Sequence, residues 1–196
     1  MSQNHQTKVK IKRILLIADP NQVTNQLRRR LAQNQDDRVG IITNKPAQLA
    51  QINPRHELVF ENHQDLNGII TSQGFDAVYI DLAQKDGNTI EKIITALRNS
   101  KVKQLILMLN ANDQPNDPRI KQIVELVKGT RLITTVIRAA KLGRSHTLSY
   151  QVVHNAQPAG DSSVSAVSVA DLAYQVIQDP QLEAGADVGI AQLPYK

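Results

Sequence analysis

Residues 11–33 have the sequence IKRILLIADPNQVTNQLRRRLAQ, and this stretch decides the fold. Its first part, residues 11–18, is an almost continuous aliphatic run, as expected for a strand that is covered on both faces of a sheet. An apolar residue then recurs at every fourth position, at Val23, Leu27 and Leu31. This spacing predicts a helix with one apolar stripe, and we expect the arginines at positions 28–30 to face solvent.

The same alternation of short aliphatic runs and helical patterns continues along the chain. Further strands are predicted at residues 39–43, 57–61, 77–82, 104–109, 132–138 and 186–191, with an extra strand at 150–153. The last helix is expected to begin at Ser168 as its N-cap, with Asp171 completing a capping box. This order predicts an α/β fold with a doubly wound parallel sheet of six or seven strands in three α/β/α layers. We assign residues 11–196 to one domain and residues 1–10 to a disordered leader.

The composition favours a cytoplasmic protein with an aliphatic core. Hydrophobic residues make up 41% of the 196 residues and aromatic residues only 3%, so Ile, Leu, Val and Ala must fill the interior. The absence of cysteine fits the reducing cytosol. The N-terminal apolar run is too short for a signal peptide or a membrane span, so no membrane partner is expected.

A net charge of +5 raises the question of an anionic partner. The basic residues are dispersed, and no aromatic residue lies among their densest groups. We therefore expect a solvated basic face rather than a nucleic-acid site. The five histidines are not spaced like metal ligands, so no metal site is predicted. The sequence contains neither the G-x-S-x-G motif of serine hydrolases nor a phosphate-binding P-loop.

Two segments in the second half of the chain resemble a known family. Residues 134–138 (TTVIR) resemble its Thr-x-x-Arg-Pro sixth strand, and residues 164–173 (VSAVSVADLA) resemble the Ser-x-x-Asp-Leu/Val-Ala segment that opens its last helix. In their order and spacing, these segments resemble those of the atypical short-chain dehydrogenase/reductase family, in its NmrA-like and NADH-flavin-reductase-like branch. The resemblance implies a Rossmann-like fold, NAD(P)H as cofactor and reductase activity toward a flavin or quinone.

The resemblance also implies where the cofactor would lie, and the chain departs from the family there. The family's G-x-x-G-x-x-G turn holds the diphosphate, but Ala18, Asn21 and Thr24 stand at its three glycine positions. Asn21 tolerates a left-handed conformation, whereas Asp19 adds a carboxylate beside the expected diphosphate. We predict weak or undetectable binding of NAD(P)H. The implied cofactor-binding positions are Ala18, Asp19, Asn21, Gln22, Val23, Asn44 and Lys45 (2′-phosphate), Asn62 (adenine) and Leu82.

The family's catalytic residues are mostly replaced. None of the four tyrosines is followed by lysine four residues later, and Leu109 stands where the flavin-reductase branch has a serine. The remaining catalytic candidates are Asn110, which follows Leu109, and Arg138, at the end of the sixth strand. Arg138 is expected either to contact a ligand or to form an ion pair with Asp81 or Asp171.

Three hypotheses about function remain open. The first is an NAD(P)-binding oxidoreductase of the flavin- or quinone-reductase type, which rests on fold analogy. The second is a non-catalytic relative that keeps the fold as a ligand sensor or interaction module, and the third is a basic protein that binds a polyanion. The expected partner is a small molecule or dinucleotide in the cleft at the carboxyl ends of the strands, with homo-oligomerisation left open.

Overall fold

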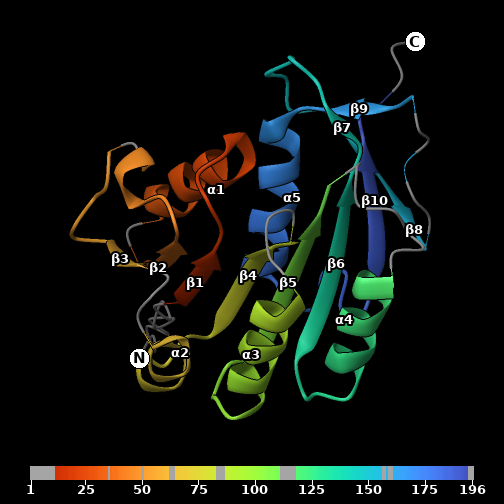
Figure 1. The fold of residues 1–196 in the computed structure, drawn as a ribbon. Coiled ribbons are helices and arrows are strands. Elements are labelled where there is room, and N and C mark those ends of the chain that lie inside the picture. Colours follow the sequence, from red (N-terminus) through yellow and green to blue (C-terminus); the bar gives the residue numbers. More distant parts are fainter. Residues whose placement is uncertain are drawn as a thin grey trace, which may run out of the picture.

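Figure 1 shows the computed structural model of the chain, which describes residues 12–34, 36–49, 51–61, 65–82, 87–110, 118–155, 158 and 161–193. Its central sheet has the strand order β3-β2-β1-β4-β5-β6-β10-β8. The strands are β1 (Arg13–Ile17), β2 (Arg38–Thr43), β3 (Glu57–Glu61), β4 (Ala77–Asp81), β5 (Gln104–Leu109), β6 (Ile133–Ala139), β8 (Gln151–His154) and β10 (Asp187–Ala191). The predicted leader, residues 1–10, lies outside the described residues.

The doubly wound sheet is confirmed, with one strand more than the six or seven expected. All neighbouring strands pair in parallel except β8, which pairs antiparallel with β10 at the edge of the sheet. The extra strand predicted at residues 150–153 is therefore present, one residue further along. Two short strands, β7 (Lys141–Leu142) and β9 (Ser163–Val164), form a separate parallel pair.

Helices cover both faces of the sheet and give the expected three layers (Figure 1). One face carries α1 (Gln22–Gln33) and α5 (Ala166–Gln178), which pack against each other. The other face carries α2 (Leu66–Ser72), α3 (Gly87–Arg98) and α4 (Pro118–Lys128). A 3-10 turn, η1 (Pro46–Gln48), lies between β2 and β3. Within the described residues, no helix is long and apolar enough to span a bilayer.

The core is aliphatic, as the composition predicts. Strand β1 supplies both faces, because Ile14 and Leu16 point toward α1 and α5 while Leu15 and Ile17 point toward α2, α3 and α4. The apolar stripe of α1 is buried on β1, as expected from its four-residue spacing. Burial of such side chains is the main force that holds these layers together.

The outward orientation predicted for the arginines of α1 is wrong at Arg28. Its guanidinium lies inside and binds the Glu57 carboxylate twice, from Nε to Oε1 at 2.8 Å and from Nη2 to Oε2 at 3.1 Å. The two side chains are only 5% and 3% exposed. This buried, doubly bonded ion pair joins α1 to β3. Removing either partner would leave an uncompensated charge in the core and should destabilise the fold.

The start of α5 also differs from the prediction. Ser165 is the N-cap, and its hydroxyl oxygen accepts a hydrogen bond from the backbone N–H of Ser168 at 3.0 Å. Ser168 therefore lies inside the helix, and Asp171 is too far along it to close a capping box. The Asp171 carboxylate instead pairs with Arg30 and accepts a hydrogen bond from the hydroxyl of Tyr150 at 2.8 Å.

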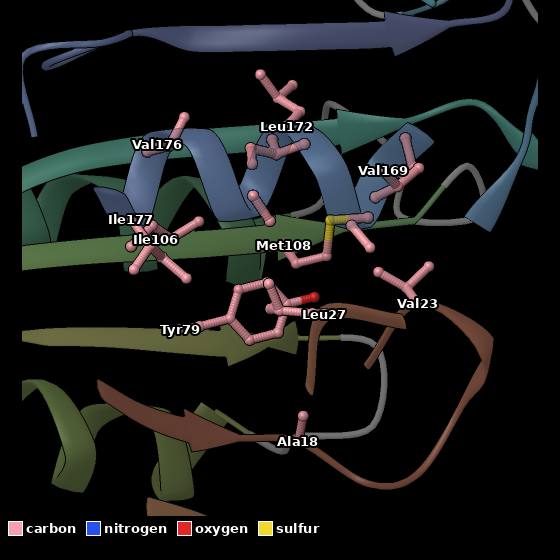
Figure 2. Packing of buried hydrophobic residues seen from close by; sticks show 14 of the residues in the cluster. Ala18, Val23, Leu27, Tyr79, Ile106, Met108, Val169, Leu172, Val176 and Ile177 are labelled. Carbon is pink, nitrogen blue, oxygen red and sulfur yellow. The ribbon is translucent and has the colours of Figure 1, made fainter. Parts of the chain in front are cut away.

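Tyr79 is a fully buried exception within the aliphatic core. Its ring lies with Leu27 and Met108 between β4 and α1 (Figure 2), and its hydroxyl has no hydrogen-bond partner among the described residues. Burial, and to a smaller extent the nearby Asp81 carboxylate, raises the pKa of Tyr79. This hydroxyl is a polar group in an apolar layer and should oppose folding.

We expect the substitution Tyr79→Phe to stabilise the protein, by about 1 kcal/mol, because it removes a buried hydroxyl without leaving a partner unpaired. The matched substitution Tyr150→Phe should destabilise it by about 1 kcal/mol, because the Asp171 carboxylate then loses a donor. Urea unfolding followed by circular dichroism measures both changes. A loss of stability in Tyr79→Phe would contradict the assignment.

Candidate functional site

The sheet reverses its strand order at β1, which lies between β2 and β4. The chain leaves β1 through residues 18–21 and enters α1, so this turn lies at the carboxyl edge of the sheet. In doubly wound folds, ligands bind in the crevice at such a reversal point. The turn after β1 and the ends of β2 and β4 are therefore the first place to examine for a ligand site.

Asp19, which the sequence places beside the expected diphosphate, points toward the end of β2. It is 8% exposed, and its Oδ1 accepts hydrogen bonds from the Thr43 hydroxyl and from the Asn44 backbone N–H, both at 2.9 Å. Ala18 is fully buried and continues the ladder, with its N–H bonded to the carbonyl of Ile42 at 3.1 Å. The Asp19 carboxylate thus fastens the end of β1 to the end of β2.

Asn21 does not use the left-handed conformation that its position allowed. Its backbone is extended, with φ −148° and ψ 179°, and it is the N-cap of α1. Its Oδ1 accepts a hydrogen bond from the backbone N–H of Thr24 at 2.9 Å, and its Nδ2 donates one to Oδ2 of Asp81 at 2.8 Å. One side chain thus caps the helix and joins it to the end of β4.

Thr24 occupies the third glycine position at full burial. Its hydroxyl makes no hydrogen bond to any described residue. A β-branched side chain thus stands where the family has a glycine, at the point where α1 begins to pack on the sheet. Of its neighbours on α1, Val23 is buried in the core and Gln22 is exposed at the first helical position.

The other implied cofactor positions are spread along the same edge. Asn44 and Lys45 follow β2 and are both exposed, and the Lys45 N–H donates to the Thr43 hydroxyl at 3.0 Å. Leu82 is 1% exposed and packs among the residues under α3. Asn62 lies outside the described residues.

The catalytic candidates lie on the far side of β4. Asn110 is half-buried after β5, and Arg138 is the neighbour of Leu109 in the register of β5 and β6. Arg138 does form an ion pair, but not with Asp81 or Asp171. It binds Asp187 of β10, from Nε to Oδ1 at 2.6 Å and from Nη2 to Oδ2 at 2.8 Å.

The partner of Arg138 follows from strand pairing. Strand β10 lies next to β6, and Gly189 is the register partner of Arg138, so Asp187 is two residues away along the adjacent strand. The Nη1 atom of Arg138 is buried and has no hydrogen-bond partner within the described residues. Of the five N–H donors of this guanidinium, two bind Asp187, and the two on the buried Nη1 bind none of the described residues.

The hydrogen bonds of the turn between β1 and α1 show what a bound dinucleotide would have to displace. A diphosphate seated at α1 would need the Thr24 N–H, which the Asn21 side chain already occupies, and it would approach the Asp81 carboxylate. The turn as it stands is therefore a poor seat for a diphosphate, because the Asn21 side chain takes the place of such a ligand at the Thr24 N–H. The end of β2 fits better, because exposed Asn44 and Lys45 present an amide and a cation there.

Sequence reasoning missed two of the carboxylates that bind the candidate residues. Asp81 was considered as a partner of Arg138 and not of Asn21, and Asp187, at the start of β10, was not considered. Asparagine at an N-cap position is a readable signal, whereas the partner of its amide depends on the strand order. No group of three or more His, Asp or Glu residues in the described ranges is arranged to hold a metal ion.

Comparisons with known proteins agree with this architecture. A family model described as NAD(P)H-binding matches residues 22–180. A Rossmann-fold NAD(P)-binding family protein from Shigella flexneri is similar, with a TM-score of 0.82 and 23% identity over 95% of this chain and 99% of that chain. No curated protein sequence matches the chain.

Two enzymes with solved structures are also similar in fold. An oxidoreductase from Lactococcus lactis has a TM-score of 0.65 and 17% identity, over 92% of this chain and 91% of its own. An anaerobilin reductase from Escherichia coli O157:H7 has a TM-score of 0.67 and 14% identity, over 94% of this chain and 99% of its own. At these identities the structural matches show the fold, and the family model carries the assignment.

The double role of Asn21 predicts a graded response to substitution. Asn21→Ala should destabilise the protein by about 1 kcal/mol, because it removes the cap and the bond to Asp81. Asn21→Ser should cost less, because the hydroxyl can still accept from Thr24 N–H. Gln22→Ala, at the adjacent exposed position, is the matched control and should stay within about 0.5 kcal/mol of the parent in thermal unfolding. Equal losses for Ala and Ser would mean that the cap contributes nothing.

Proposed function

The chain belongs to the NAD(P)H-binding family, and we propose that it is an oxidoreductase-like protein of the flavin- or quinone-reductase type that binds NAD(P)H weakly. The family match covers most of the chain and includes α1, β2 and the retained Arg138. The proposed binding place is the carboxyl edge between β2 and β4, where the strand order reverses.

The observation that carries the low affinity is the pair of hydrogen bonds made by Asn21. A bound diphosphate would have to displace the Asn21 oxygen from the Thr24 N–H and lie near the Asp81 carboxylate. Two like charges about 4 Å apart repel by about 4 kcal/mol near a protein surface. A helix N-terminus returns only about 0.3–2 kcal/mol, so repulsion exceeds attraction at this turn.

The end of β2 supports a preference between the two cofactors. Lys45 is exposed beside Asn44, and no acidic side chain follows them in residues 46–49. The nearby Asp19 carboxylate is held by Thr43 and Asn44. A lysine at this position attracts the 2′-phosphate that NADPH has and NADH lacks. We therefore expect NADPH to bind more tightly than NADH.

A second candidate function is a non-catalytic relative that keeps the fold for ligand sensing or protein interaction. Leu109 favours it, because this residue is buried under α3 and α4 at the position where the reductase branch has a serine. The two candidates differ in turnover. Oxidation of NADPH with a flavin or quinone acceptor above the rate without protein supports the reductase, and its absence at saturating NADPH supports the non-catalytic relative.

We expect NADPH to bind with a dissociation constant on the order of 100 µM or weaker, measured by the change in NADPH fluorescence. The double variant Asp19→Gly/Asn21→Gly should bind about tenfold more tightly, because it opens the Thr24 N–H and removes a carboxylate.

Lys45→Gln provides the matched control for that titration. It should weaken NADPH binding and leave NADH binding unchanged, because only NADPH carries the 2′-phosphate. A low-micromolar constant for the unmodified chain, or no gain in the double variant, would show that Asn21 does not limit binding.

A further inference from the structure

A hollow lies at the edge of the sheet opposite the candidate site, where β1, β2 and β3 begin. It has a volume of about 340 Å³, on the face of the sheet that carries α2. Its floor is formed by Gly40, Leu58, Phe60 and Phe75. Its rim is basic and consists of Arg13, Arg38, Arg55 and His56.

The hollow exists because this end of the sheet has little helix over it. Helix α2 is only seven residues long, and η1 is the only helical turn described between β2 and β3 (Figure 1). Leu58 is consequently 55% exposed although it lies in a strand. Gly40 keeps the floor low, because a Cβ there would lie 2.8 Å from the Phe75 ring and push it outward.

The arginines of the rim are held in place by the backbone. Arg13 and Arg38 are register partners on β1 and β2, so they start side by side on this face. Nη1 of Arg13 donates to the carbonyl of Gln73 at 3.0 Å, and Nη1 of Arg38 donates to that of Asp37 at 3.1 Å. The same Arg38 nitrogen lies 3.0 Å from Nδ1 of His56, and Arg55 is exposed beside them.

Two carboxylates lie near the basic rim among the described residues. Asp76 accepts a hydrogen bond from the Arg13 backbone N–H at 3.0 Å, and Glu57 is the one acidic residue among the described lining residues. Its carboxylate is bound twice by Arg28 and accepts a further hydrogen bond from the Asn53 N–H at 2.8 Å. Three guanidinium groups around an apolar floor therefore leave a net positive opening.

We propose that this hollow binds a small organic anion that has an apolar body and one acidic head group. The apolar body would lie on Phe60, Phe75 and Leu58, and the carboxylate, sulfonate or phosphate would contact the arginine rim. The volume is within the range of small-molecule sites. This site is separate from the proposed dinucleotide place, because it lies at the amino ends of the strands.

The test uses 8-anilinonaphthalene-1-sulfonate, a fluorescent anion with an apolar body, and the full chain. We expect saturable binding that Arg55→Glu and Leu58→Glu each weaken about tenfold, because the two variants add a negative charge to the rim and to the floor. Both positions are exposed, so the fold should be kept, and circular dichroism checks this. The matched control is Arg144→Glu, which makes the same charge change at an exposed position outside the hollow and should leave binding unchanged.

Competition then identifies where the probe binds. Displacement by octanoate or benzoate, with no displacement by NADPH, supports the proposal and is independent of whether the protein binds NADPH. Displacement by NADPH, or equal weakening in Arg144→Glu, would place the probe elsewhere and overturn it. Displacement only by a DNA oligonucleotide, with steep dependence on salt, would also overturn it in favour of a polyanion surface.

Discussion

Strand β1 is hydrogen-bonded on both sides, to β2 and to β4, and is covered by helices on both faces. Residues 14–17 of this strand have no exposed edge or face, so aliphatic side chains suit them, and the chain can leave the strand only at its ends. The exit at residue 18 therefore falls between the ends of β2 and β4. The same constraint that builds the core thus brings Asp19, Asn21, Thr43 and Asp81 to one edge.

In relatives of this fold, glycines usually keep that edge open for a diphosphate. In this chain, side chains supply the hydrogen bonds instead. Asp19 binds the end of β2, and Asn21 binds both the start of α1 and the end of β4. A turn that satisfies its own donors and acceptors is stable without a ligand, and a ligand must then compete with the protein for the same hydrogen bonds.

The sequence predicted those features that depend on local pattern. Aliphatic runs located the strands, four-residue spacing located α1, and the family resemblance indicated the Rossmann-like fold. The sequence-based prediction failed where the partner of a charged side chain lies far away in the sequence. Arg28 turns inward because Glu57 lies on β3, and Arg138 binds Asp187 because β10 lies next to β6. Neither neighbour can be deduced from spacing along the chain, because both follow from the order of strands in the finished sheet.

The two outer strands of the sheet have a consequence for self-association. Strand β8 is four residues long and ends at His154, which binds Glu183, and β3 is five residues long and ends at the exposed Glu61. Short, charged edges are poor templates for pairing with a second chain. Pairing of two copies along either of these short edges is therefore disfavoured.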